Sequence, residues 1–345
     1  FDRIQRYSGY RNPFKLKFML QRFASILLLL FVFVSCKNEP ELVKIQGPVF
    51  GTSYQIQYYD LDNKSYQKQF DSIFEVLNQS MSNYIPSSHI SKINKNERVH
   101  TDSHFDTVFS AAKQIYRETE GVFDPTIGKL VNAWDFGSEN NKTALDSTKV
   151  DSLMKSVGFN RVGVVNGVIM KRTNTFIDFN AIAKGYGVDV ISDFLESKGI
   201  TNYLVDIGGE LRAKGIHLNK QKEWAIGIEN PNFDGSQSFS KVIGITDKAM
   251  ATSGTYRKFK VDDNGNKYAH IINTKTGYPT RTNILSVSVI ADKCMMADGY
   301  ATAFQAMGIK KVDYFLAKHP ELQVYLIFEN ENGELETKSF NGFPK

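Results

Sequence analysis

Apolar residues follow two different spacings along this chain. Four stretches carry them three or four residues apart and are therefore predicted to be helices: 67–84, 103–120, 181–198 and 293–307. Six alternating or continuous apolar stretches predict strands: 49–59, 175–179, 203–207, 224–228, 241–246 and 285–290. Residues 256–272 are typical of a β-hairpin, with Asn264-Gly265 at its turn.

The order of these elements bears on the fold class. Helices and strands are mixed without a strict strand–helix–strand alternation, which favours the α+β class. We expect one large domain over residues 47–345, built as two closely joined lobes, with mixed or antiparallel sheets flanked by helices.

The N-terminal segment differs in composition from the rest. Residues 26–34 are an unbroken apolar run, too short to span a bilayer but suited to the core of a secretory signal peptide. Arg22 supplies the positive charge that precedes such a run if translation starts at Met19. Residues 1–36 are therefore predicted to be a leader, and residues 37–46 a short tether.

Cys36 follows the apolar run directly, behind Phe33-Val34-Ser35. This order resembles the lipobox of bacterial lipoproteins, in which the cysteine is lipidated and the leader is removed before it. Three acyl chains on Cys36 would anchor the protein essentially permanently to a membrane. The expected location is the extracytoplasmic (periplasmic) side of the cell inner membrane. The alternative is an ordinary cleaved signal peptide with a chance cysteine.

The charge distribution argues against one class of partner. The formal net charge is +5, but the first 36 residues contain six basic residues and one acidic residue. The rest of the chain has 36 residues of each sign, so its net charge is zero. A nucleic-acid-binding surface usually shows a clustered positive excess, and we therefore expect no nucleic-acid partner.

Cys294 is the only cysteine after Cys36. The mature protein therefore has neither an intrachain disulfide nor a metal site built on several thiolates. Because Cys294 lies in an apolar helical stretch, we expect it to be a small core residue.

Four segments place polar groups where an ordinary core would not need them. The first, Gly121-Val122-Phe123-Asp124-Pro125-Thr126, follows the end of a predicted helix. Asp124 is a candidate binding residue, but an aspartate before proline is often only a turn-former. Both interpretations stay open at this point.

The second segment runs from Asp178 to Gly187. Asp178 lies at the end of a predicted strand, and Lys184 lies one turn into the following helix. A helix N-terminus offers free N–H groups and the positive end of the helix dipole, which suits phosphate, and Lys184 adds a mobile positive charge. The glycines do not follow the G-x-G-x-x-G order of a dinucleotide-binding loop.

The third segment, from Tyr268 to Pro279, places His270 on a hairpin strand before a turn rich in hydroxyls and glycine. Because a histidine side chain has a near-neutral pKa, His270 is the best candidate for a general base. The alternative is a hydrogen-bonded structural histidine.

The fourth segment contains Asp298 and Thr302, which are four residues apart and share one face of a predicted helix. A carboxylate beside a hydroxyl supplies hard oxygen ligands, the type that Mg²⁺ prefers. The alternative is a pair on a solvated face. It is weakened by apolar neighbours that indicate a buried helix: Met295, Met296, Ala303 and Phe304.

In this order, the segments resemble the ApbE family of FAD:protein FMN transferases. The resemblance runs from about Phe50 to Gly308 and implies an ApbE-like, T-fold-like core; the family's lipoprotein leader agrees with Cys36. It also covers further motifs: Gly51-Thr52, Met81-Ser82-Asn83-Tyr84, Ser91-Lys92-Ile93-Asn94, Asp206-Ile207-Gly208-Gly209-Glu210 and Ser253-Gly254-Thr255-Tyr256-Arg257.

The resemblance implies an enzyme, a flavinyltransferase, whose substrate is FAD. It would cleave the FAD pyrophosphate, release AMP and join FMN through its phosphate to a Thr or Ser hydroxyl of an acceptor protein. Acceptors in the family are typically extracytoplasmic subunits of membrane redox complexes. Phosphoryl transfer depends mostly on positioning and charge neutralisation, for which a Mg²⁺ ion and a lysine are suitable.

The resemblance also implies roles for particular residues. Asp298, Thr302 and the carbonyl of Ala181 would bind Mg²⁺. FAD contacts would come from Phe50, Tyr84, Val122, Phe123, Asp124, Asp178, Lys184 and Ile271 or Ile272. Phe50 stands where the family commonly has a methionine, and Asn273-Thr274 replaces the usual Asp-Pro.

Two other functions remain open from the sequence. A Mg²⁺-dependent FAD pyrophosphatase would use the same residues with water as the nucleophile and release FMN and AMP. A flavin-binding lipoprotein would hold FAD without chemistry, although a carrier has no need of a metal-ligand pair at the pyrophosphate.

Overall fold

The computed structural model describes residues 39–139, 145–256, 259–261 and 267–345. Glu41–Lys345 forms one compact unit. The predicted leader, Cys36 and the predicted Asn264-Gly265 turn lie outside the described residues. Within the described part of the chain, no helix is both long and apolar enough to cross a membrane.

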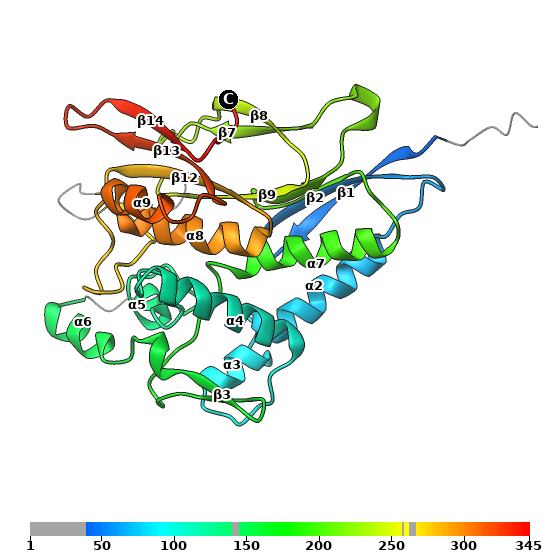
Figure 1. Ribbon diagram of the computed structural model, residues 1–345. Helices are drawn as coiled ribbons and strands as arrows, with labels where there is room; N and C mark the ends of the chain where they lie inside the picture. Colours follow the sequence, from blue (N-terminus) through cyan, green and yellow to red (C-terminus); the bar gives the residue numbers. More distant parts are fainter. Residues whose placement is uncertain (1–38, 140–144, 257–258, 262–266) are drawn as a thin grey trace, which may run out of the picture. The chain divides into compact units, whose positions relative to one another are not determined.

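An eight-stranded sheet runs through this unit, and each strand is antiparallel to its neighbours (Figure 1). The fold class is α+β, as predicted. In spatial order the strands are β1 (Glu41–Val49), β2 (Thr52–Asp60), β5 (Tyr203–Ile207), β6 (Glu210–Lys214), β9 (Lys248–Gly254), β12 (Ile284–Ala291), β13 (Gln323–Glu329) and β14 (Leu335–Phe340).

Two layers of helices cover one face of the sheet (Figure 1). Helix α7 (Ala183–Ser197) packs on β5 and β6, and α8 (Cys294–Met307) packs on β9 and β12. Outside them, α2 (Gln67–Met81) packs against α7, and α4 (Ser103–Glu118) packs against α8. These are the four helices that the apolar spacing predicts, and their predicted apolar faces are the buried ones.

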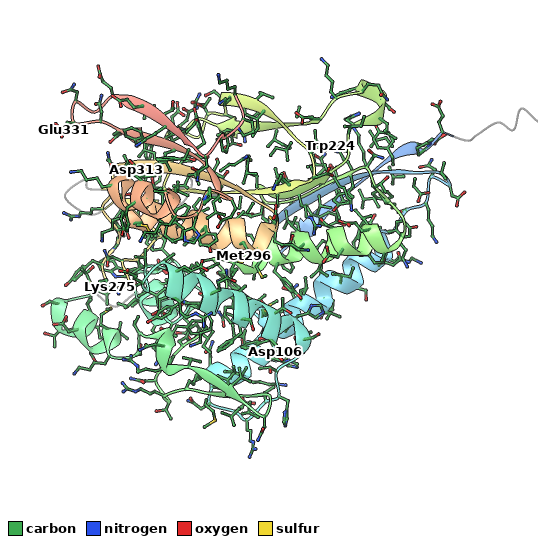
Figure 2. All side chains as sticks on the ribbon, viewed as in Figure 1. Asp106, Trp224, Lys275, Met296, Asp313 and Glu331 are labelled. Atoms are coloured by element: carbon green, nitrogen blue, oxygen red, sulfur yellow. The ribbon has the colours of Figure 1, made fainter. Side chains whose placement is uncertain are left out.

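A hairpin of β7 (Trp224–Glu229) and β8 (Phe239–Ile245) covers the opposite face of the sheet (Figure 1). Trp224 is buried between this hairpin and the sheet, as its label in Figure 2 shows. The sheet therefore contacts a core on both faces, which explains why every residue of β12 is buried and why its sequence is continuously apolar or small.

Shorter elements complete the unit. They are α3 (His89–Asn94), α5 (Gly128–Ala133), α6 (Ser147–Met154), η1 (Phe159–Arg161), β3 (Gly163–Val165), β4 (Val168–Met170), η2 (Leu218–Lys220), β10 (Phe259–Val261), β11 (Lys267–Ala269) and α9 (Ile309–Leu316). Strands β10 and β11 pair as the predicted hairpin.

The start of the unit differs from the prediction. Residues 41–46, predicted to be part of a tether, belong to β1, which pairs with β2 along its whole length. Phe50 and Gly51 form the two-residue turn between these strands, with φ of +49° and +74°. Such turns favour residues that tolerate positive φ, typically Asn-Gly. Phe50 carries no such signal, which is why the predicted strand 49–59 includes the turn.

The strand predicted at 175–179 is wrong, because only Phe176 forms a β-bridge there, with Ile127. The neighbouring backbone groups bond elsewhere. Ile177 N–H donates to the side-chain oxygen of Asn94 at 2.8 Å, and Asp178 N–H donates to the Pro125 carbonyl at 2.8 Å. This stretch is apolar because it is buried. Among the described residues, no strand pairs with it apart from that single bridge.

Candidate functional site

The four polar segments meet in the folded chain, although they are far apart in the sequence. Three hydrogen bonds join them: Asp178 N–H to the Pro125 carbonyl at 2.8 Å, the Thr274 hydroxyl to the Gly121 carbonyl at 2.6 Å, and Gly185 N–H to Asp298 Oδ2 at 3.0 Å. The fold therefore assembles one site from the segments that sequence reasoning singled out separately.

The close crossing of α7 and α8 brings the two halves of this site together. A Cβ atom added at Gly185 would lie 2.5 Å from the Cys294 carbonyl oxygen and 2.8 Å from the Asp298 Cβ, so only glycine fits there. Gly185 is the third residue of α7, so its N–H has no partner within the helix. Because this N–H donates to Asp298, the carboxylate lies at the start of α7.

Asp298 and Thr302 lie on α8, where the predicted spacing places them on one face. Asp298 is only 4% exposed, and the Thr302 hydroxyl lies 3.3 Å from the hydroxyl of Ser253 on β9. Burial raises the pKa of Asp298, while the charge of Lys184 and the N–H of Gly185 oppose this rise. Because the nearby positive groups offset the burial of this charge only in part, the Asp298 carboxylate is a favourable ligand for a cation.

Lys184, the second residue of α7, forms an ion pair with Glu210 at the start of β6. Glu210 is a site residue that the sequence reasoning did not assign, although it belongs to the Gly208-Gly209-Glu210 motif. Burial and the charge of Asp298 raise the pKa of Glu210 to about 7, although the charge of Lys184 opposes the rise. Burial lowers the pKa of Lys184, but attraction to Glu210 and Asp298 outweighs it, so this pKa is raised.

The donor set fits a hard divalent cation. The described residues contain no cluster of three or more His, Cys, Asp or Glu side chains suited to a metal. The predicted set consists instead of one carboxylate, one hydroxyl and one backbone carbonyl, which are the oxygen ligands that Mg²⁺ prefers together with water and substrate phosphate. Glu210 Oε2 is also buried without a hydrogen-bond partner in the described part of the chain.

Asp124 serves a turn in this structure. Its Oδ1 accepts the N–H and hydroxyl of Thr126 at 2.8 Å and 2.6 Å, and its Oδ2 accepts the N–H of Phe159 at 3.2 Å. The turn-forming interpretation therefore describes its side chain, and contact with FAD stays a prediction. Its neighbour Phe123 is buried, whereas Val122 is half-buried.

Tyr84 and Asp178 lie near each other. The side chain of Tyr84 is 60% exposed, and burial together with the charge of Asp178 raises its pKa. Asp178 accepts hydrogen bonds from the backbone and side-chain amides of Asn180, at 2.8 Å and 3.3 Å. An exposed aromatic ring beside a carboxylate that precedes α7 by five residues suits a ligand contact.

Phe50 lies against α7 from the β1–β2 turn. Its ring packs edge-on against Phe74 with centroids 5.6 Å apart. A Cβ atom at Gly187 would lie 2.9 Å from the same ring, so this glycine makes room for it. A bulky residue with positive φ is strained, which is more often seen where function requires it.

His270 follows the last residue of β11 and lies with its ring centroid 6.2 Å from that of Phe136. Ile271 and Ile272 after it are buried. Asn273, in place of the family's aspartate, accepts the N–H groups of Lys275 and Thr276 at 2.8 Å and 3.1 Å. The backbone carbonyl of Asn273 also accepts the Gly277 N–H at 2.8 Å, so its side chain and backbone close the turn together. The role of His270 as a base stays a prediction.

Comparison with known proteins shows the family of this chain. The family model described as "ApbE family" matches residues 50–326. The chain belongs to the ApbE family. It is 35% identical to the FAD:protein FMN transferase of Vibrio cholerae over an alignment of 335 residues that covers 93% of this chain and 97% of that protein. It is 33% identical to the FAD:protein FMN transferase of Haemophilus influenzae, over 90% of this chain and 93% of that protein.

Solved structures of ApbE proteins share the fold. The flavin transferase ApbE from Vibrio cholerae superposes with a TM-score of 0.79 at 32% identity, covering 88% of this chain and 98% of that one. The flavinyl transferase ApbE from Pseudomonas stutzeri, in its apo form, superposes with a TM-score of 0.77 at 25% identity, covering 88% and 96%.

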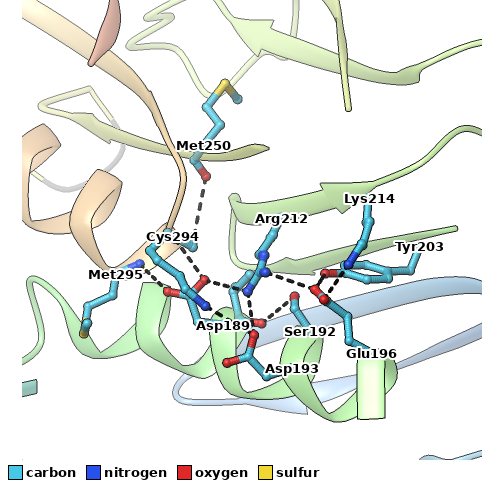
Figure 3. Close-up of polar contacts among 12 residues, drawn as sticks. Asp189, Ser192, Asp193, Glu196, Tyr203, Arg212, Lys214, Met250, Cys294 and Met295 are labelled. Carbon is cyan, nitrogen blue, oxygen red and sulfur yellow. Dashed lines mark hydrogen bonds and ion pairs between the residues drawn. The ribbon is translucent and has the colours of Figure 1, made fainter. Parts of the chain in front are cut away.

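A second polar cluster in this ApbE chain surrounds the buried Asp189 (Figure 3). Asp189 on α7 accepts the first two N–H groups of α8, from Cys294 at 3.0 Å and Met295 at 2.9 Å. Arg212 on β6 pairs with Asp189 at 3.4 Å and also binds Asp193 and Glu196. This cluster caps α8 from a neighbouring helix and so fixes the helix that carries Asp298.

Cys294 is a core residue, as predicted. Its thiol is free and fully buried, and its Sγ lies 3.7 Å from the Met250 carbonyl oxygen. Burial raises the pKa of this thiol well above its usual value, so Cys294 is not a reactive thiolate.

Proposed function

We propose that this chain transfers the FMN part of FAD to a Thr or Ser hydroxyl of an acceptor protein, through a phosphoester bond, with Mg²⁺ and with release of AMP. The chain is a flavin transferase of the ApbE family, as membership and the names of its relatives support. The observation that carries the finer proposal is the meeting of Asp298, Lys184 and the start of α7 in one buried site.

The residues divide the binding of FAD between them. Asp298, Thr302 and the Ala181 carbonyl would hold Mg²⁺, which when bound neutralises charge on the pyrophosphate. The N–H groups of Ala183 and Gly185 at the start of α7 already donate to the Phe179 carbonyl and to Asp298, so the Lys184 ammonium would bind the phosphate oxygens from the protein side. Because these groups are largely buried, their electrostatic effect is stronger than in water.

The transfer step exchanges the phosphoanhydride linkage of FAD for a phosphoester linkage to the acceptor. The acceptor's hydroxyl oxygen bonds to the phosphorus of the FMN half, and the bond from that phosphorus to the bridging oxygen breaks. The bridging oxygen leaves with AMP. His270 is the proposed base that takes the hydroxyl proton, since a threonine hydroxyl is a poor nucleophile at neutral pH.

The proposed location follows from the leader. A lipid on Cys36 would hold the domain at the extracytoplasmic side of the inner membrane, where a subunit of a membrane redox complex is the proposed acceptor. Growth in labelled fatty acid tests this: Cys36→Ser is expected to abolish label incorporation and membrane retention. Retention of both by the variant would contradict the lipid anchor.

The main experiment combines the chain from Lys37 onward with FAD, Mg²⁺ and a flavin-acceptor subunit. We expect a fluorescent acceptor band on a denaturing gel, equimolar AMP, and loss of both with EDTA or Asp298→Ala. Steady AMP release with a dark acceptor would indicate a pyrophosphatase instead. Bound FAD without either product would indicate a carrier.

His270 is tested separately. His270→Ala is expected to slow transfer by about 10²-fold or more, as removal of a general base does, while FAD affinity changes little. An equal fall in FAD affinity would end the assignment of His270 as a base.

A further inference from the structure

We propose that Glu210 is a positioning residue: it holds the Lys184 ammonium so that Lys184 does not pair directly with Asp298, and the Asp298 carboxylate stays available to a divalent cation. This inference rests on the proposed function, because it concerns the same metal site. It assigns a role to a residue outside the predicted ligand set.

The ion pair is asymmetric in its surroundings. The side chain of Glu210 is 5% exposed, whereas that of Lys184 is 31% exposed. Only Glu210 Oε1 binds the ammonium, and Oε2 is buried without a hydrogen-bond partner among the described residues. A half-satisfied carboxylate does not stabilise a packed core. The presence of Glu210 at this position therefore indicates a role beyond packing.

The backbone explains why Glu210 can act as an anchor. Glu210 begins β6, a central strand with β5 on one side and β9 on the other. Lys184 lies in the first turn of α7 and has a long, flexible stem. The rigid partner therefore determines where the mobile ammonium rests.

Asp298 is the alternative partner for this ammonium. Its carboxylate accepts the N–H of Gly185, the residue after Lys184, at 3.0 Å, and the charge of Lys184 acts on both carboxylates. Without the charge of Glu210, the ammonium has one carboxylate left to neutralise. A direct Lys184–Asp298 pair would occupy the oxygen atoms that a cation needs.

Mg²⁺ binding to the chain from Lys37 onward tests this, measured by calorimetry with and without saturating FAD. Glu210→Gln is expected to weaken Mg²⁺ binding about tenfold or more. The double variant Glu210→Gln with Lys184→Met is expected to recover near wild-type affinity for Mg²⁺ in the absence of FAD, because the competing ammonium is gone. Asp193→Asn, an exposed carboxylate on the same helix, is the matched control and should leave Mg²⁺ affinity unchanged.

The outcomes separate this inference from the proposed function. If the wild-type protein binds no Mg²⁺ under either condition, the metal site itself is wrong, and the inference falls with it. If the wild type binds Mg²⁺ and Glu210→Gln binds it equally well, only the inference is wrong. If the double variant stays as weak as Glu210→Gln, Glu210 contributes to the metal directly, and the positioning role is overturned.

A further variant covers a loss of folding. Glu210→Asp keeps the charge and is expected to retain the ion pair, so its Mg²⁺ affinity should lie closer to the wild type than that of Glu210→Gln. Thermal unfolding monitored by circular dichroism establishes that each variant is folded. A folded Glu210→Asp protein that loses Mg²⁺ binding completely would also overturn the positioning role.

Discussion

Two buried charge clusters lie next to each other on the same three elements, α7, β6 and α8. The first contains Asp189, Arg212 and the N–H groups of Cys294 and Met295; the second contains Lys184, Glu210 and Asp298. Glu210 and Arg212 are two residues apart on β6 and therefore point to the same side of the sheet. The two clusters thus lie on the same elements and contain the same kinds of group: carboxylates, a basic side chain and backbone N–H groups.

The two clusters differ in how fully their oxygens are used. Both oxygens of Asp189 accept a backbone N–H, and Arg212 balances the charge. In the second cluster one oxygen of Glu210 has no partner in the described residues, and two carboxylates share the charge of Lys184. The comparison shows that buried polar groups with all their hydrogen bonds formed stabilise the fold. Buried polar groups with an unused hydrogen-bonding atom indicate a place for a ligand.

The largest expected effect concerns the incomplete cluster. Asp298→Asn keeps an oxygen for the Gly185 N–H but removes the charge, so FMN transfer should fall about 10³-fold, as expected for loss of a metal ligand. The free energy of unfolding should change by less than about 1 kcal/mol. Gel fluorescence and urea unfolding measure the two effects. A lower free energy of unfolding with unchanged FMN transfer would show that Asp298 stabilises the fold and does not serve the metal site.

The complete cluster should show the opposite pattern. Asp189→Ala leaves Arg212 and two N–H groups without their buried partner, and should lower the free energy of unfolding by about 3 kcal/mol. The matched control is Asp193→Ala, whose side chain is 58% exposed and should cost less than about 1 kcal/mol. Urea unfolding measures both variants. An equal loss in the free energy of unfolding for the two would show that Asp189 does not cap α8.

Gly185 joins the two clusters at the helix crossing. Gly185→Ala should cost about 2 kcal/mol by overpacking and should weaken Mg²⁺ binding, because the added Cβ pushes against the backbone of Cys294 and against Asp298. Gly163→Ala is the control, since nothing lies within 4 Å of its added Cβ. A stable Gly185→Ala protein with unchanged Mg²⁺ affinity would mean that the crossing tolerates the change.

The smallest expected effect is a pH dependence without metal. Below about pH 4.5, Glu210 is protonated in both states. As pH rises toward 7, the unfolded chain loses this proton while the folded chain keeps it, so the stability of the folded chain falls, by an amount on the order of 1 kcal/mol. Above the folded pKa of about 7 the contribution is constant. Glu210→Gln should lack this fall; parallel pH profiles of the two proteins would refute it.

Much of the fold follows from local patterns. The four long helices and the strands β5, β7, β8 and β12 coincide closely with the predicted stretches, because burial of one face imposes its period on the sequence. The alternation of Val43, Ile45 and Val49 also marks β1, and this signal was present in the sequence. The turn at Phe50 and the bridge at Phe176 carried no such signal, because neighbours in space decide them.

The site shows the same division. The sequence by itself determined that Asp298 and Thr302 share a helix face and that Lys184 lies near a helix start, since both depend only on helical geometry. Whether Asp124 binds the Phe159 N–H, which carboxylate holds Lys184, and why residue 185 is glycine were decided only by the tertiary structure. Those facts depend on contacts between segments up to 113 residues apart, which no local pattern encodes.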